Sequence, residues 1–293
     1  MNIFILAAGK GTRLEPLTNR TPKPLIPFLN KPMINYNLEL FNHFKFNNFI
    51  INISHQKEKF KTFIPFIKNI SIKYSFEEKL LGTGGGIKRA SLYFEDSPTI
   101  VMNGDIFYDF NILTLVNNYK KQNNPLAILV VKENKSGNVT ANNGVITSLR
   151  GKQSNNYKNS DKHYSFTGLH ILSQEVISKI DEFCIIDTYI KLLNSNRILI
   201  FVDTQDSFWA DLGTFDSYLK NSQYLISNYK KLNYLKGAIS PKLFNLSSYN
   251  FITNSIVGKN IKLLDPTITI KNSVIFDNFV QKEKKDIIDE ILF

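Results

Sequence analysis

The sequence has little cysteine and tryptophan and no long apolar run. Its single cysteine, Cys184, cannot form a disulfide within the chain, so the fold must be stabilised by core packing, as is usual in a reducing compartment such as the cytoplasm. No apolar stretch reaches the roughly 20 residues that a membrane-spanning helix needs. The N-terminus also lacks the charged and then apolar pattern of a signal peptide. These absences predict a cytoplasmic protein without a membrane partner.

The chain also lacks a cationic block, although it is basic overall. It carries 36 Lys and Arg against 25 Asp and Glu, a formal net charge of +11. The basic residues are scattered, and no motif for binding DNA or RNA is present. We therefore expect no nucleic-acid partner. The positive charge instead favours anionic substrates.

The 293 residues suffice for one large domain and a small appendage. Over the first two-thirds, short β-like runs alternate with amphipathic stretches, a pattern typical of an α/β domain. The expected strands are Asn2–Ala8, Asn48–Ile53, Ile70–Ser75, Thr99–Met102, Leu126–Lys132, Gly144–Ser148, Phe166–Leu172 and Ile198–Val202. The expected helices are Met33–Phe44, Lys57–Lys68, Gly86–Tyr93, Ile112–Lys121, Gln174–Ile180, Ile186–Asn194 and Asp216–Tyr229. The polar run Gly151–His163 predicts a mobile loop.

The C-terminal part of the sequence contains a short internal repeat in place of the alternating strand and helix patterns. Asn-Ser-Ile-Val at 254–257 is echoed by Asn-Ser-Val-Ile at 272–275, 18 residues later. This spacing equals three hexapeptides, one coil of a left-handed β-helix, and a plain pair of strands is the alternative. We predict a domain over 1–228, a linker over 229–253 and a truncated β-helix-like segment over 254–293, with Gln281–Phe293 as a short capping helix. The open end of such a segment indicates packing on the main domain or on another subunit, as in a homo-oligomer.

The most informative segment follows the first expected strand. A short apolar run leads into a loop with Gly9 and Gly11, and Arg13 and Lys23 follow. Glycines let the backbone point its N–H groups at phosphate oxygens, and Arg and Lys add positive charge. The spacing does not match a P-loop, since Lys10 lies between the two glycines, and it does not match a dinucleotide fingerprint, since Leu14 stands at the place of the third glycine. The segment predicts a loop that binds a nucleoside triphosphate, and an ordinary Gly-x-Gly turn is the alternative.

Residues 6–27 closely resemble the signature of the sugar-1-phosphate nucleotidyltransferases, the enzymes that make nucleotide sugars. The resemblance implies a Rossmann-like catalytic domain with a mixed, mainly parallel sheet. It implies that Arg13 and Lys23 are catalytic: Arg13 covers the β/γ charge of the triphosphate, and Lys23 stabilises oxygens near the α-phosphorus or the sugar phosphate. The triphosphate-binding residues that it implies are Leu6, Ala7, Ala8, Gly9, Gly11, Thr12 and Arg13.

Two further motifs contain an aspartate. The run 101–105, Val-Met-Asn-Gly-Asp, is an apolar strand ending in a carboxylate, and ligands bind at the carboxyl edge of α/β sheets. An Asp in this place also serves turns and helix caps. The run 208–214 resembles the family's W-x-D-[ILV]-G-T segment, and a hairpin with a packed tryptophan is its structural alternative. The resemblance implies that Asp105 and Asp211 are catalytic and bind Mg²⁺, and that Asn103 contacts the nucleotide.

The nucleobase and sugar sites are also implied by resemblance. Glycines in the run 80–90 precede an expected helix, and the family's Leu-Gly-Thr-x-Gly segment meets the base, which implies roles for Gly82, Thr83 and Gly84. A second phosphate loop is the alternative. Gly168 matches the family strand that lies against the sugar.

Two further sugar-binding candidates rest on weaker patterns. Asp187 is a candidate for the sugar hydroxyls, or it caps the helix that follows. The family's Glu-Lys-Pro pattern, whose lysine meets the sugar phosphate in many relatives, is absent, and Lys152 is the nearest substitute.

Together these motifs imply a Mg²⁺-dependent enzyme of nucleotide-sugar biosynthesis, of the kind that supplies cell-envelope polysaccharide. Its partners would be a nucleoside triphosphate and a sugar 1-phosphate. GTP with mannose 1-phosphate, giving GDP-mannose, is the first choice. The alternatives are uridylyl transfer to glucose 1-phosphate or N-acetylmuramate 1-phosphate, cytidylyl transfer to phosphocholine, and a regulator that binds a nucleotide sugar without catalysis.

Overall fold

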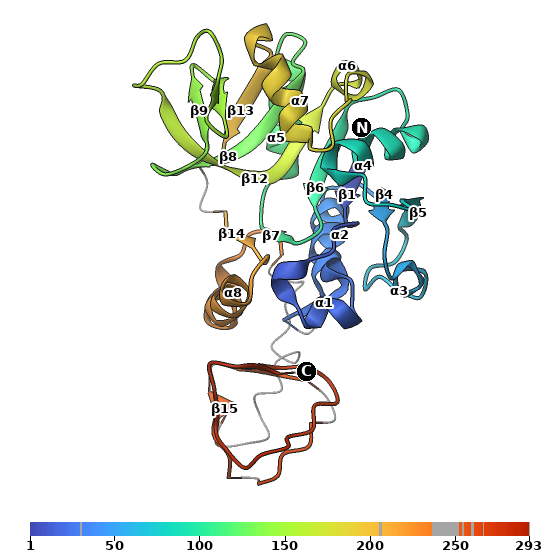
Figure 1. The fold of residues 1–293 in the computed structure, drawn as a ribbon, viewed down its shortest axis with the longest axis vertical. Coiled ribbons are helices and arrows are strands. Elements are labelled where there is room, and N and C mark those ends of the chain that lie inside the picture. Colours follow the sequence, from blue (N-terminus) through green and yellow to red (C-terminus); the bar gives the residue numbers. More distant parts are fainter. Residues whose placement is uncertain are drawn as a thin grey trace. The chain divides into compact units, whose positions relative to one another are not determined.

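The computed structural model describes residues 1–29, 31–204, 207–235, 252–253, 255–258, 261–265 and 267–292. The chain forms two compact units, each built from separate stretches of sequence (Figure 1). Unit 1 comprises Met1–Gly9, Phe41–Gly104 and Asn111–Ser207. Unit 2 comprises Lys10–Leu40, Asp105–Phe110 and Phe208–Phe293.

Unit 1 is built on a mixed ten-stranded sheet in the order β11-β10-β13-β8-β12-β6-β1-β4-β5, with β9 pairing β10 and β12. The strands are β1 (Asn2–Leu6), β4 (Asn48–Ile53), β5 (Ser71–Phe76), β6 (Thr99–Asn103), β8 (Ala127–Glu133), β9 (Val139–Asn142), β10 (Val145–Leu149), β11 (Lys152–Gln153), β12 (Lys162–Leu172) and β13 (Ile198–Val202). Strands β6, β1, β4 and β5 are parallel, whereas β12 runs antiparallel to β6 and β8. This arrangement confirms the expected Rossmann-like α/β class.

The carboxyl ends of three parallel strands meet at one edge of this sheet. Leu6 of β1 stands in register with Asn52 of β4 on one side and with Asn103 of β6 on the other. The edge at which the sequence predicts nucleotide binding therefore carries two asparagines, one on each side of β1.

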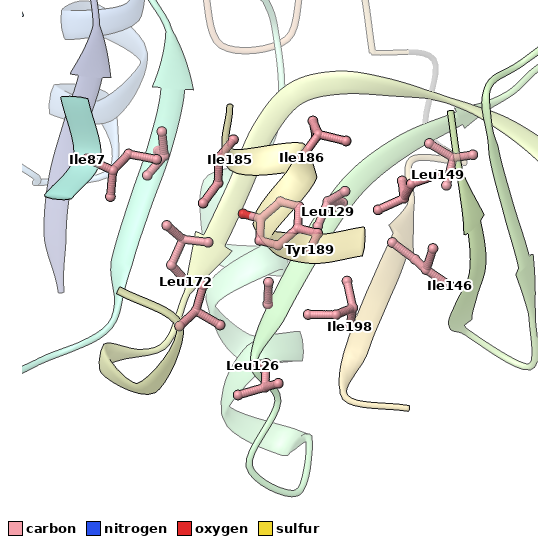
Figure 2. Packing of buried hydrophobic residues seen from close by; sticks show 14 of the residues in the cluster. Ile87, Leu126, Leu129, Ile146, Leu149, Leu172, Ile185, Ile186, Tyr189 and Ile198 are labelled. Atoms are coloured by element: carbon pink, nitrogen blue, oxygen red, sulfur yellow. The ribbon is translucent and has the colours of Figure 1, made fainter. Parts of the chain in front are cut away.

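Helices pack on this sheet through apolar stripes. The helices of unit 1 are the end of α2 (Met33–His43), α3 (Lys57–Lys61), α4 (Gly82–Ala90), α5 (Ile112–Lys121), α6 (Gln174–Ser178) and α7 (Ile185–Leu192). On α7, Ile185, Ile186 and Tyr189 recur at helical spacing and are buried. Figure 2 shows Tyr189 among side chains of neighbouring strands, including Leu129 of β8 and Ile198 of β13. No helix in the described part of the chain is long and apolar enough to cross a membrane.

Unit 2 holds the segment that follows β1 and the segment around residue 211. Its elements before the tail are the 3₁₀ turns η1 (Thr12–Leu14) and η2 (Lys23–Leu25), α1 (Leu17–Arg20), β2 (Pro27–Phe28), β3 (Lys31–Pro32), the start of α2, β7 (Ile106–Tyr108), β14 (Trp209–Asp211), α8 (Phe215–Asn228) and η5 (Tyr229–Lys231). The rings of Phe28, Tyr36, Phe107 and Tyr218 are fully buried and meet mostly edge to face, with centroids 5.0–6.0 Å apart. This aromatic cluster joins three sequence stretches into one core.

The C-terminal residues form two parallel ladders, β15 (Ile252–Thr253), β17 (Ile270–Lys271) and β19 (Ile287–Ile288), and β16 (Ile256–Val257), β18 (Val274–Ile275) and β20 (Ile291–Leu292). Ile252 pairs with Ile270, 18 residues later, so the expected coil length is confirmed. Ile270 then pairs with Ile287. Ser255 and Ser273, the serines of the echoed motif, are buried, and the N–H of Ser273 donates to Oγ of Ser255 at 3.0 Å. The repeat therefore encodes a stack of coils.

Several sequence predictions need correction. The expected capping helix Gln281–Phe293 is wrong. Strands β19 and β20 instead form a third coil, in which Ile287 and Leu292 pack on the apolar side chains of the two coils before it. The expected loop Gly151–His163 is partly strand, with β11 at its start and β12 from Lys162. Helix α3 ends at Lys61 instead of Lys68, since Pro65 cannot continue a helix. Most of the expected linker, residues 236–251, lies outside the described residues.

One buried histidine lies in the sheet of unit 1. His170 of β12 is 2% exposed, and its Nδ1 lies 3.1 Å from the hydroxyl of Tyr189. Burial lowers the pKa of His170 to about 3 from the ordinary 6.5, because the apolar surroundings disfavour the charged imidazolium. The folded protein therefore holds this side chain neutral.

We expect His170 to make the fold acid-sensitive. The unfolded chain takes up a proton near pH 6.5 and the folded chain only near pH 3, so stability is lost progressively as the pH falls through this window. The loss is roughly 1.4 kcal/mol per pH unit from this residue. His170→Gln should flatten the pH dependence of the free energy of unfolding between these values, whereas the matched control His163→Gln, at an exposed site, should not. Equal pH dependence in wild type and His170→Gln would contradict the assignment.

Candidate active site

The loop after β1 turns sharply at Gly11. Gly11 has φ +69°, and a Cβ there would lie 2.8 Å from Cγ2 of Thr18 and 2.9 Å from Cβ of Lys23. The carbonyl of Gly11 also accepts a hydrogen bond from the Thr18 hydroxyl at 3.2 Å. A side chain at position 11 would thus be strained and would push Lys23 away. The glycine of the motif is needed for the packing of this turn.

Lys23 begins η2 and is 6% exposed, so its ammonium is nearly removed from water. Its Nζ makes an ion pair with Oδ2 of Asp105. A buried lysine requires such a partner, because an unpaired charge in this position would be strongly unfavourable. The structure thus brings together two of the four predicted catalytic residues, which lie 82 positions apart in the chain.

A two-stranded antiparallel sheet brings the main chains of the two predicted metal ligands together. Strand β14 pairs β7 with Asp211 opposite Ile106, the residue that follows Asp105. The N–H of Leu212 donates to the carbonyl of Asp105 at 3.1 Å, which continues the pairing by one step. The Asp105 side chain is 27% exposed and Asp211 is exposed, so an incoming ligand can reach both carboxylates.

Gly213 is the point on which these side chains converge. A Cβ at Gly213 would lie 2.6 Å from Oδ1 of Asp211, 2.9 Å from Nη2 of Arg13 and 3.2 Å from Nζ of Lys23. The absence of a side chain therefore leaves space in which one carboxylate and two cations face each other. With Asp105, the cluster holds two negative and two positive charges.

The next residue of the same motif has a structural role. Thr214 is the N-cap of α8, where its hydroxyl accepts from the N–H of Ser217 in a capping box. The helix start fixes the position of the chain directly after Asp211 and Gly213. Thr12, also predicted to bind the triphosphate, is exposed in η1 directly before Arg13.

In unit 1, the residues predicted to hold the triphosphate lie at the end of β1 and directly after it. Leu6 is half-buried, Ala7 and Ala8 are buried, and Gly9 is exposed with open space where a Cβ would be. The N–H of Ala7 donates to Oδ1 of Asn52 at 2.7 Å, which fixes the start of the loop. The carbonyl of Leu6 accepts from the N–H of Gly104 at 2.8 Å.

The predicted base-binding residues lie in the first turn of α4, which begins at Gly82, four residues before the expected helix. The N–H of Gly84 donates to the carbonyl of Phe183 at 2.9 Å, and the Thr83 hydroxyl accepts from the N–H of Ile185 at 3.0 Å. A Cβ on Gly82 would lie 2.2 Å from the same Phe183 carbonyl. These glycines therefore allow the segment before α7 to pack tightly on α4.

Two other predicted residues of unit 1 lie together. Gly168 on β12 has φ +83°, and a Cβ there would lie 2.8 Å from Nδ2 of Asn103. The register of β12 against β8 shifts between Phe166 and His170, so a local irregularity accompanies this glycine. Gly168 thus makes room for the asparagine at the end of β6.

The remaining sugar-site candidates lie elsewhere in unit 1. Lys152 is exposed on β11, the outermost strand, and β10 and β9 lie between β11 and the start of β12 in the sheet. Asp187 lies in the first turn of α7, with its Oδ1 3.7 Å from Nη1 of Arg150. The structure does not bring Lys152 next to Gly168.

The motifs missed Asn52 and Glu77, which connect the two predicted nucleotide segments of unit 1. Nδ2 of Asn52 donates to Oε1 of Glu77 at 2.7 Å, and Oε2 of Glu77 accepts from the N–H of Leu81 at 3.0 Å. The available signal was a polar residue at the end of an apolar strand, Phe-Ile-Ile-Asn over 49–52. That signal alone does not tell a structural amide from a binding residue.

The chain is similar to known nucleotidyltransferases. A protein-family model described as "Nucleotidyl transferase" matches residues 3–228. A UTP--glucose-1-phosphate uridylyltransferase of Synechocystis sp. is 30% identical over 240 residues, which cover 74% of this chain and 61% of the relative. A mannose-1-phosphate guanyltransferase of Gibberella zeae is 28% identical over 245 residues, which cover 79% of this chain and 66% of the relative. The chain thus spans somewhat under two-thirds of the length of these relatives.

Solved structures share the fold. A putative glucose-1-phosphate thymidylyltransferase from Bacillus anthracis superposes with a TM-score of 0.63 at 21% identity, covering 77% of this chain and 94% of that one. A UDP-glucose pyrophosphorylase complexed with UDP-glucose superposes with a TM-score of 0.62 at 18% identity, covering 78% and 98%.

The turn at Gly11 can be tested by one methyl group. Gly11→Ala should lower the free energy of unfolding by roughly 1–3 kcal/mol, because it combines the cost of a positive φ with overpacking against Thr18 and Lys23. The matched control Gly9→Ala adds a methyl into open space and should change stability little. Denaturant unfolding of both variants compares the two sites, and equal midpoints would show that Gly11 is not constrained.

Proposed function

The chain belongs to the nucleotidyl transferase family, and from this membership and its site we propose that it transfers a nucleoside monophosphate from a nucleoside triphosphate to a sugar 1-phosphate. The products are a nucleoside diphosphate sugar and pyrophosphate. The observation that carries the proposal is the convergence of Arg13, Lys23 and Asp211 on the space above Gly213, with Asp105 paired to Lys23. Such a cluster suits phosphoryl chemistry, which depends mainly on positioning and on neutralising charge.

The proposed reaction is a direct displacement. An oxygen of the sugar 1-phosphate attacks the α-phosphorus of the triphosphate and forms the new P–O bond. The bond between the α-phosphorus and the bridging oxygen breaks, and the electron pair leaves with pyrophosphate. Because the attacking phosphate is already anionic, no side chain has to remove a proton from it and no covalent enzyme intermediate is needed.

Arg13 and Lys23 would bind different phosphate groups in this reaction. Arg13 is exposed and presents a planar guanidinium that can pair with two phosphate oxygens, which suits the β- and γ-phosphates. Lys23 is buried and held by Asp105, so its ammonium is a fixed point charge for oxygens near the α-phosphorus or the sugar phosphate. The ion pair with Asp105 keeps Lys23 in place before substrate arrives.

The residues also fit a magnesium ion. Asp105 and Asp211 offer accessible carboxylate oxygens from paired strands, and Mg²⁺ prefers one or two carboxylates together with substrate phosphates. When bound, the ion would supply positive charge close to the phosphates. The metal ion and the ammonium of Lys23 would compete for the Asp105 carboxylate. Lys23 would therefore exchange its contact with Asp105 for substrate oxygens.

For the substrates, we propose GTP and mannose 1-phosphate, giving GDP-mannose. Support comes from relatives named mannose-1-phosphate guanyltransferase, one of which matches 92% of this chain at 28% identity and so extends over its C-terminal part. UTP with glucose 1-phosphate is the second candidate, favoured by the 30% identity to the uridylyltransferase of Synechocystis sp.. The family match ends at residue 228, which supports a catalytic domain over 1–228 followed by a C-terminal tail.

A pyrophosphate-release matrix tests the proposed function. Each of the four nucleoside triphosphates is combined with mannose 1-phosphate, glucose 1-phosphate, N-acetylmuramate 1-phosphate and phosphocholine in the presence of Mg²⁺. We expect the highest rate with GTP and mannose 1-phosphate. Release with UTP and glucose 1-phosphate alone would move the assignment to the second candidate, and no release with any sugar phosphate would refute the proposed activity.

Asp105→Asn should abolish most of the activity. The substitution removes one carboxylate of the proposed metal pair and the charged partner of Lys23, so we expect the barrier to rise by several kcal/mol, a loss of several powers of ten in kcat/KM. The control Asp96→Asn changes an exposed carboxylate in unit 1 and should leave kcat/KM unchanged. A near wild-type rate for Asp105→Asn would rule out the metal-binding role.

A further inference from the structure

A buried hydrogen-bonded chain crosses the nucleotide side of unit 1. It runs from the N–H of Ala7 to Oδ1 of Asn52 (2.7 Å), from Nδ2 of Asn52 to Oε1 of Glu77 (2.7 Å), and from Oε2 of Glu77 to the N–H of Leu81 (3.0 Å). Asn52 is 1% exposed and Glu77 is 2% exposed. Ala7 is one of the predicted triphosphate-binding residues and directly follows β1, and Leu81 is the residue at the N-cap of α4. Two short side chains thus connect both predicted nucleotide segments.

This series of hydrogen bonds contains one charged group, the carboxylate of Glu77, and no cation. Both side-chain bonds to the Glu77 carboxylate come from uncharged donors, an amide and a backbone N–H. Burying a carboxylate with neutral partners costs free energy that an apolar pair of similar volume would not cost. Simple packing is therefore a poor explanation for these two residue types.

The fit around the pair is tight. A Cβ on Gly86 of α4 would lie 2.8 Å from Nδ2 of Asn52 and 2.8 Å from Oε1 of Glu77. The helix therefore packs directly over the hydrogen bond between the two side chains. In addition, the N–H of Glu77 donates to the carbonyl of Ile53 at 2.8 Å, so the main chain beside Glu77 is also held.

The bonds also fix the direction of the amide. Asn52 must accept from Ala7 and donate to Glu77, because the reverse orientation would set its NH₂ group against the Ala7 N–H and its oxygen against the carboxylate. Every donor in the chain thus faces an acceptor in one arrangement only. Neither side chain can rotate without leaving a buried polar group unpaired. The hydrogen bonds therefore hold the main chain at Ala7 and the main chain at Leu81 at a fixed separation.

We propose that Asn52 and Glu77 are a positioning pair that sets the distance between the triphosphate loop and the N-terminus of α4, and thereby the nucleoside triphosphate affinity of the enzyme. The inference rests on the proposed function, since it takes both segments to bind one nucleotide. Neither residue needs to touch the substrate, because they act through the main chain at Ala7 and at Leu81.

The pair can be tested by exchanging its polarity. Asn52→Asp alone sets a carboxylate against the Glu77 carboxylate, and Glu77→Gln alone leaves one amide NH₂ group facing a donor. In the double variant Asn52→Asp with Glu77→Gln, the new carboxylate accepts from Ala7 and from the new amide, and the amide oxygen accepts from Leu81. All three bonds are restored, only the bond between the two side chains has the reverse direction, and the net charge equals that of the wild type.

We expect each single variant to bind the nucleoside triphosphate about tenfold more weakly, and the double variant to recover most of this loss, as for coupled neighbours. Two measurements read this out. One is the dissociation constant of GTP and of UTP by titration calorimetry without sugar phosphate. The other is the pair of KM values, of which only that for the triphosphate should rise in the single variants.

The matched control applies the same exchange to exposed neighbours. Asn48→Asp lies on the same strand as Asn52, and Glu78→Gln is adjacent to Glu77, and both positions are exposed. These variants should leave both KM values unchanged. If a single variant of the buried pair does not fold, Gly86→Ala serves instead, since its methyl group separates the pair without removing a polar group.

Two outcomes would overturn the proposal. One is a double variant as defective in triphosphate binding as the single variants. The other is single variants with lower thermal stability but unchanged dissociation constants and KM values, which would show a purely structural pair. Failure of the proposed function looks different: the wild type would then bind the triphosphate without releasing pyrophosphate from any substrate pair. A wild type that binds neither GTP nor UTP would refute both.

Discussion

The pairing of β14 with β7, which brings the main chains at Asp105 and Asp211 together, is the constraint on which the candidate site of unit 2 depends. The pairing of β14 with β7 sets Asp211 opposite the residue after Asp105, and the two negative charges must then be balanced. Lys23 and Arg13 balance them, and the loop after β1 has to fold so that both cations arrive. Gly11 allows the turn, and Gly213 leaves the space. The motifs of the first and last thirds of the chain are thus parts of one electrostatic arrangement.

The same balance explains how the site can exist before substrate binds. Lys23 is nearly buried, and an unpaired ammonium there would destabilise the fold, so its contact with Asp105 serves the free protein. In the proposed reaction, Lys23 exchanges this internal contact for phosphate oxygens of the substrates, which would leave Asp105 available to hold a metal ion. In the free protein, the two carboxylates and the two cations of the cluster sum to zero net charge. Substrate recognition then depends on geometry as much as on charge.

In unit 1, the predicted nucleotide-binding segments are held in place mainly by hydrogen bonds to their main chain. The main-chain N–H groups of Gly84 and Ala7 are occupied by internal partners, and the Thr83 hydroxyl is too. The glycines at 82, 84 and 86 each admit a close neighbour, either the segment before α7 or the Asn52–Glu77 pair. The glycine-rich run therefore has a packing role that its sequence does not distinguish from a binding role.

Periodicity predicted much of the fold well. The strand Asn48–Ile53 and the helix Ile112–Lys121 have the expected bounds, because apolar spacing and, for the helix, an Asn N-cap mark them clearly. The errors lie where tertiary contacts override local pattern. Glycines at 82–86 begin a helix because Glu77 and the segment before α7 hold its first turn, and the charged segment from 281 forms a coil because an apolar stack is already present beside it.

The sequence by itself determined the residue types of the site and the family, because the spacing of Gly11, Arg13 and Lys23 and the two aspartate motifs are local properties of the chain. The tertiary structure decided which of these residues meet. It paired Lys23 with Asp105 and placed Asp211 beside Gly213. It also left Lys152 on the outermost strand and formed the buried pair Asn52 and Glu77. Those facts follow from strand pairing and packing between distant segments, which no local pattern encodes.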